Sequence, residues 1–132
     1  MRGGSPFSYA VFRLVPRVER GEQLNVGVVL FSRPLKYLGA RTGLDERRVA
    51  ALWPELDPET IRPHLTAIEK VAAGDPSGGP IARLDPGERF YSLSSPSSTI
   101  IQPSAVHTGI SADPAAELDK LFRTLVLMPD AS

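Results

Sequence analysis

One stretch of the chain, from Ser92 to Ser111, carries most of the side chains that could do chemistry. Its twenty residues hold nine hydroxyl groups, Gln102 and His107, but no Asp, Glu, Lys or Arg, in a chain that is 23% charged. Without a carboxylate the segment cannot form a site for a hard cation by itself. Hydroxyls, backbone N–H groups of turns and a histidine are instead the groups that bind a neutral polar or anionic ligand.

Three interpretations of this segment remain open. In the first, the serines and threonines form turns around Pro96 and Pro103, and His107 is an ordinary strand residue. In the second, the segment lines a binding pocket that performs no reaction. In the third, the chain is a small metal-independent hydrolase or transferase in which His107 is the general base for a serine nucleophile, Ser95 or Ser98. No Gly-x-Ser-x-Gly pattern marks an activated serine, so no catalytic residue is assigned.

Arg13 is a further candidate, because it shares one face of a predicted strand with Val11 and Val15. An unpaired guanidinium is costly to bury, so Arg13 must reach solvent, pair with an acid such as Glu22, or face a ligand. The sequence favours a structural ion pair. In the enzyme hypothesis, Arg13 would instead hold an anion.

The composition excludes several classes of protein. The chain has no cysteine, which excludes disulfides, a thiolate nucleophile, and zinc or iron–sulfur sites built on sulfur. The longest apolar run, Val26 to Phe31, is too short to cross a bilayer, and Arg13 interrupts the apolar stretch that a signal peptide would need. We therefore expect a cytoplasmic chain without a metal or a cofactor.

The charges balance overall, with 15 Lys and Arg against 15 Asp and Glu, but they are spread unevenly. Residues 1–48 hold nine Lys and Arg and four Asp and Glu. Ordinary solvated arginines explain this excess most simply, and zero net charge disfavours nucleic-acid binding. That alternative requires one shared basic face formed by Arg17, Arg20, Arg33, Arg41, Arg47 and Arg48.

Three strands begin the predicted fold. Alternating apolar residues predict a strand over Tyr9–Val15, and a run that is apolar on both faces predicts a central strand over Asn25–Phe31. A third strand is predicted over residues 37–42. Because the connections are short, the three strands should form an antiparallel meander.

Helices and short strands follow the meander. Asp45, the pair Asp57-Pro58 and the pair Asp113-Pro114 are start signals for three helices. From Leu118, apolar residues recur at spacings of 3, 4, 7 and 8, and Gly74 should end the middle helix. Short strands are predicted over residues 89–93, 99–102 and 106–110.

This order of elements predicts one α+β domain over residues 1–132. Its sheet should be largely antiparallel, with the N-terminal meander extended by short later strands and with helices packed on one face. Residues 74–88 should form a surface loop, and residues 1–6 and 129–132 should be flexible.

Three stretches together resemble a known family. They are Tyr9-Ala-Val-Phe-Arg-Leu-Val-Pro followed by Arg20-Gly-Glu-Gln-Leu-Asn-Val-Gly-Val, then Leu38-Gly-Ala-Arg, and then Ser95-Pro-Ser-Ser-Thr-Ile-Ile-Gln-Pro-Ser with His107-Thr-Gly. The set is similar to the bacterial domain-of-unknown-function family 3037 over nearly the whole chain. The resemblance implies no activity and no catalytic residue. It does imply that four residues belong to shared motifs: Arg13, Asn25, Gln102 and His107.

The leading hypothesis is a non-catalytic binding or accessory module that acts with a protein partner. The family resemblance implies a HipA-like kinase as that partner. We expect the four motif residues to converge on one concavity, which would bind a small polar or anionic ligand or the partner itself.

Overall fold

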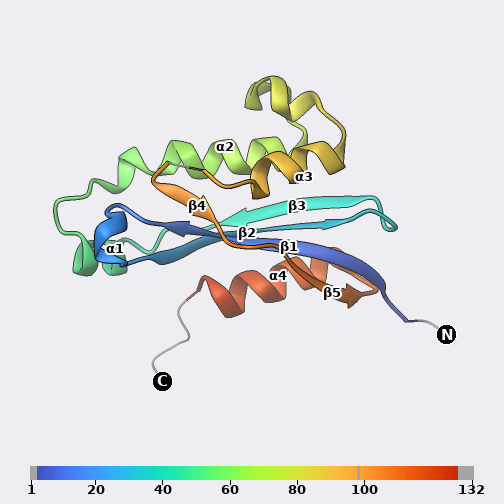
Figure 1. Ribbon diagram of the computed structural model, residues 1–132, viewed down its shortest axis with the longest axis horizontal. Helices are drawn as coiled ribbons and strands as arrows, with labels where there is room; N and C mark the ends of the chain where they lie inside the picture. Colours follow the sequence, from blue (N-terminus) through green and yellow to red (C-terminus); the bar gives the residue numbers. More distant parts are fainter. Residues whose placement is uncertain (1–2, 98, 128–132) are drawn as a thin grey trace.

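The computed structural model describes residues 3–97 and 99–127, and its centre is an antiparallel sheet of five strands (Figure 1). The order is β3-β2-β1-β4, and β5 pairs with β1 next to β4. This confirms the predicted α+β class and the N-terminal meander. The strands are β1 (Ser5–Leu14), β2 (Leu24–Ser32), β3 (Tyr37–Thr42), β4 (Ile101–Pro103) and β5 (His107–Ser111).

Helices cover both faces of the sheet, as Figure 1 shows edge-on. On one face, Phe12 of β1 packs with Leu65 of α2 and Phe90 of α3. On the other face, Val28 and Leu30 of β2 pack with Leu118, Phe122 and Val126 at α4. The helices are α1 (Glu46–Leu52), α2 (Arg62–Ala73), α3 (Pro86–Ser94) and α4 (Pro114–Leu125).

The prediction that the helices pack on a single face was therefore too narrow. β2 is apolar on both faces, so each face needs a cover to remove its side chains from water. α4 provides the second cover. Among the described residues, none of the helices is long and apolar enough to span a membrane.

Two of the three predicted start signals, Asp45 and Asp113-Pro114, begin α-helices as predicted. The Asp45 carboxylate accepts hydrogen bonds from the backbone N–H groups of Arg47 and Arg48, and Asp113 caps α4 in the same way. Asp57 caps a single 3-10 turn, Pro58–Thr60, which leads into α2. Gly74 ends α2 in the left-handed conformation with φ of 72°.

The prediction of a strand over residues 89–93 was wrong, because these residues belong to α3. Asp85-Pro86 is the same start signal as Asp57-Pro58, and the Asp85 carboxylate accepts a hydrogen bond of 2.9 Å from the Glu88 N–H. This hydrogen bond lowers the pKa of Asp85. Phe90 turns inward and stacks on Phe31 at 5.5 Å between ring centroids. Burial of this ring outweighs the alternating pattern of the segment.

Two other predicted boundaries also change. Ser5 and Pro6, expected in a flexible end, are part of β1 and pair with Ser111 and Ile110. The predicted loop at residues 74–88 contains two 3-10 turns, Pro76–Gly78 and Pro80–Arg83, and the start of α3.

The outer edge of β1 pairs with two separate strands, β4 over residues 12–14 and β5 over residues 5–9. Ser104 lies at the break between them and is buried, with 7% of its surface exposed. Its N–H donates to the Val11 carbonyl at 2.8 Å, and its Oγ accepts the Val11 N–H at 2.9 Å. A side-chain oxygen thus replaces the backbone carbonyl that a continuous strand would supply.

Replacing Ser104 with Ala should lower the free energy of unfolding by about 1–3 kcal/mol, because the buried Val11 N–H loses its acceptor. Urea unfolding of the variant measures this loss. Ser92→Ala is the matched control, since the Ser92 hydroxyl has no hydrogen-bond partner among the described residues. Equal losses for the two variants would contradict the role assigned to Ser104.

Candidate functional site

Three of the four motif residues lie side by side across the sheet. Arg13 of β1 is directly opposite Asn25 of β2 on one side and Gln102 of β4 on the other. Directly opposite residues of antiparallel strands project from the same face. The row therefore lies on the face that α4 covers, since Phe12 and Ile101 next to it pack on the α2 and α3 face.

A β-bulge in β2 puts Asn25 into this row. The register passes from Phe12↔Gly27 to Arg13↔Asn25, so Val26 is an extra residue on β2. An extra residue reverses which face the following side chains take. Without the bulge, Asn25 would point to the α2 and α3 face.

Asn25 has a structural partner. Its Nδ2 donates to the Leu125 carbonyl at the end of α4 at 3.0 Å, and Arg48 donates to the Val126 carbonyl at 3.3 Å. The last carbonyls of a helix have no intrahelical donors, so these two side chains hold the end of α4 on the sheet. We therefore assign Asn25 mainly to stability.

Arg13 has no such partner. Its Nε is buried and makes no hydrogen bond within the described residues, and the side chain as a whole is half-buried. Glu22, the acid considered for Arg13, pairs with Arg20 at 2.9 Å, and this hydrogen bond lowers the pKa of Glu22. The ion pair between Arg13 and Glu22 that the sequence suggested is therefore not formed.

His107 lies on the same face of the sheet but further along β1. It is exposed and directly opposite Tyr9, with ring centroids 5.2 Å apart. Tyr9 precedes Arg13 by four residues, which is about 13 Å along a strand. The four motif residues thus share one face, in two groups: the Arg13 row and the Tyr9–His107 pair.

The serine proposed as a nucleophile lies on the opposite face of the sheet from His107. Ser95 follows α3 and donates to the Tyr91 carbonyl at 2.6 Å. No hydrogen bond joins His107 to any serine in the part of the chain that the structure describes, and Ser98 falls outside that part. The geometry therefore gives no support to a His107–serine pair.

The uncharged segment lines a different hollow, of about 180 Å³, between α2, α3 and β4. Its hydroxyls mostly bond to nearby backbone: Thr99 donates to the Ile101 carbonyl at 2.7 Å, and Ser97 accepts from the Thr99 N–H. These are the bonds of turn-forming residues. His64 of α2 also lines this hollow, and no sequence pattern connected it to the serines.

Comparison with known proteins places these residues in a family. The family model described as "Protein of unknown function (DUF3037)" matches residues 9–126, which include all four motif residues. The chain belongs to the DUF3037 family. No curated protein and no solved structure matches it.

The six arginines considered for nucleic-acid binding are spread along this DUF3037 domain. Arg20 precedes β2 and Arg33 follows it, so these two lie at opposite ends of that strand. Three of the six already have acidic partners: Arg17 pairs with Glu19, Arg20 with Glu22, and Arg41 with Asp119. These ion pairs reduce the positive charge that a phosphate backbone would meet at the three residues.

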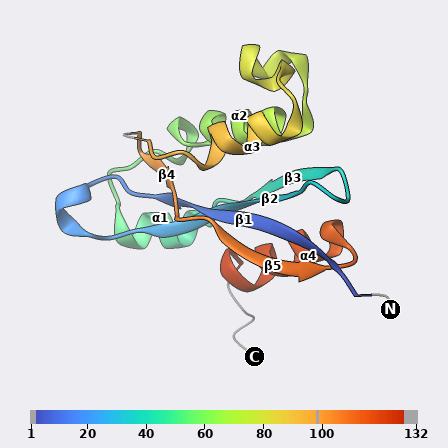
Figure 2. The same cartoon turned by 45° about the vertical axis from the view of Figure 1, so that its right-hand side comes forward.

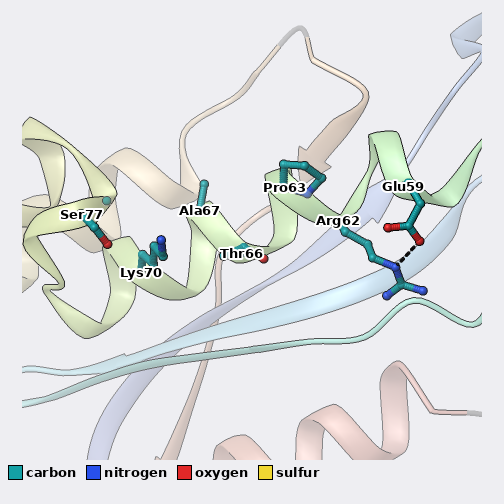
Figure 3. Close-up of a pocket in the computed structure, with 8 residues that line it drawn as sticks. Glu59, Arg62, Pro63, Thr66, Ala67, Lys70 and Ser77 are labelled. Carbon is teal, nitrogen blue, oxygen red and sulfur yellow. Dashed lines mark hydrogen bonds and ion pairs between the residues drawn. The ribbon is translucent and has the colours of Figure 1, made fainter.

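A shallow groove of about 440 Å³ follows α2 of the DUF3037 domain (Figure 3). Arg62 lies at one end, where its Nε donates to Glu59 at 2.9 Å, and this hydrogen bond raises the pKa of Arg62. Glu46 pairs with the same guanidinium. Because two carboxylates pair with Arg62, this residue is a weaker anion site than Arg13.

Asn25→Ala should lower the free energy of unfolding by about 1–2 kcal/mol, because the Leu125 carbonyl loses its donor. Gln102→Ala is the matched amide control, since the Gln102 amide makes only an exposed hydrogen bond of 3.3 Å to the Thr99 carbonyl. Denaturant unfolding should show the larger loss for Asn25→Ala. A larger loss for Gln102→Ala would show that Asn25 does not hold α4.

Proposed function

We propose that this DUF3037 chain is a non-catalytic protein-binding module that recognises a carboxylate of a protein partner through Arg13. The observation that supports this proposal is the Arg13 guanidinium, whose buried Nε has no acceptor within the described residues. A buried donor without an acceptor costs free energy, and a charged one costs more. A partner carboxylate would bind the guanidinium through both of its oxygens.

The surroundings of Arg13 suit such a role. Its neighbours across the sheet, Asn25 and Gln102, are neutral amides, so neither strand partner is an acid that would compete for the guanidinium. α4 packs mainly against β2 and β3, and on β1 it contacts the Phe7 end rather than forming many contacts along the strand. The Tyr9–His107 pair on the same face adds an aromatic surface for a side chain of the partner.

A HipA-like kinase is the partner that the family resemblance implies, and it is the first to test. A partner carboxylate that reaches Arg13 would bind on the α4 face and approach Tyr9 along β1. No step of catalysis by this chain is needed for such a module, since a regulatory partner acts through binding alone.

Arg13→Gln should weaken binding to the HipA-like kinase at least about tenfold, the loss expected when one charge-assisted contact is removed. Isothermal titration of the two purified proteins measures the affinity. The free energy of unfolding should stay within about 0.5 kcal/mol of the wild type or rise, because Arg13 holds no described partner.

Arg17→Gln is the matched control, because it removes the same charge from an exposed side chain that pairs with Glu19. It should bind like the wild type. If Arg13→Gln unfolds much more easily and binds normally, Arg13 is a structural residue. If the wild-type chain does not bind the kinase, this partner is wrong.

A further inference from the structure

β5 presents an open edge of the sheet, and the direction of its backbone groups follows from β1. The Pro6 carbonyl accepts a hydrogen bond from Ser32 of β2, whereas Val11 faces Ser104 on the opposite side. The backbone N–H and C=O groups of the odd-numbered residues of β1 therefore point towards β5. The backbone groups of their partners His107, Gly109 and Ser111 point towards β1. The backbone N–H and C=O groups of Thr108 and Ile110 therefore point away from the sheet.

The other free edges of the sheet are protected. On β3, the Thr42 N–H donates to Glu69 of α2 at 2.9 Å, and Arg41 pairs with Asp119. On β4, the outward position next to Gln102 is Pro103, which has no N–H to donate. Charged side chains, covers and prolines are the usual devices that prevent strands from pairing at an edge.

β5 has none of these devices. No Asp, Glu, Lys or Arg occurs between Arg89 and Asp113. The strand carries Ile110, which is 67% exposed, and it follows Val106, which is 46% exposed. In the part of the chain that the structure describes, no strand pairs with its outer side, and it lies at the border of the sheet in both views (Figures 1 and 2).

We propose that β5 pairs antiparallel with β5 of a second copy of this chain, in a register centred on Gly109. The outward groups of Thr108 would then exchange two hydrogen bonds with Ile110 of the other copy, and Ile110 would do the same with Thr108. Thr108 and Ile110 lie one residue before and one residue after Gly109. A two-fold axis through Gly109 therefore places each of them opposite the other in the second copy, which makes the interface self-complementary. Each exposed Ile110 packs beside a threonine instead of water.

A second copy fits this edge for two reasons besides its register. Because the strand is uncharged, self-pairing brings no like charges opposite each other. The two-fold axis lies perpendicular to the sheet, so the α4 helices of both copies lie on the same side. Since α4 packs mainly on β2 and β3, β1 separates it from the edge and it does not obstruct the contact.

This inference is independent of the proposed function. The dimer would leave the α4 face over Arg13 free, and the Tyr9–His107 pairs of the two copies would lie on one continuous sheet. Binding through Arg13 and pairing through β5 can therefore each fail without the other.

Sedimentation over a wide concentration series tests the proposal on the full chain. The mass of the wild type should rise from 14.3 kDa towards twice that value. Thr108→Pro removes an outward N–H but no bond to β1, and Ile110→Lys places a charge on the edge. Both variants should remain at 14.3 kDa throughout the series.

Val18→Lys is the matched control, because Val18 is 69% exposed and lies in the loop between β1 and β2, away from β5. It should dimerise like the wild type, and thermal unfolding should show that Thr108→Pro still folds. If Thr108→Pro does not fold, Ile110→Lys decides the question.

A wild-type chain that stays monomeric at all concentrations would overturn the proposal, as would a dimer that Ile110→Lys leaves unchanged. If the chain is monomeric and Ile110→Lys weakens only binding to the kinase, the edge accepts a strand of that partner. This outcome also overturns pairing between two copies.

Discussion

Every backbone N–H and C=O along β1 needs a partner, because this strand lies in the interior of the sheet. β2 pairs with one side of β1 from Ser8 to Leu14, with the bulge at Val26, and the other side is shared between β4 and β5. The break between these two strands would leave the buried Val11 N–H without an acceptor. Ser104 fills that position with its own side chain, which allows the chain to leave β4, shift and return as β5. The pairing of both β4 and β5 with β1 depends on this replacement of a backbone acceptor by the Ser104 hydroxyl.

The same pairing rules determine where the polar residues lie. Because β1 pairs with β2 and β4 at the same residue, Arg13 has Asn25 and Gln102 as direct neighbours, although about ninety residues separate the last from the first in sequence. The bulge at Val26 brings the Asn25 amide within reach of α4. Arg13 is thus held in a row of neutral amides, where no acid satisfies it within the described residues.

Much of the fold could be predicted from the sequence, because its signals are local. Alternating apolar residues predicted β1, a run that is apolar on both faces predicted β2, and aspartate before proline marked α4. The same signal at Asp85-Pro86 was overlooked, because the residues after Arg89 alternate like a strand. α3 forms since Phe90 is buried there against Phe31.

The site was less predictable, because it depends on long-range pairing. The row around Arg13 requires a bulge that no local pattern announces. His107 and Ser95 are close in sequence, but they lie on opposite faces because β4 and β5 separate at Ser104. His64, which shares a hollow with the serines, belongs to a helix far from them in sequence.

Pairing with β1 determines which backbone N–H and C=O groups of β5 point away from the sheet. Amide hydrogen exchange, resolved by residue in dilute solution, tests it most directly. The amides of His107, Gly109 and Ser111 should exchange slowly, and those of Thr108 and Ile110 should exchange fast. At high concentration the latter two should become protected. Slow exchange at Thr108 and Ile110 in the dilute chain, with fast exchange at their neighbours, would contradict the account.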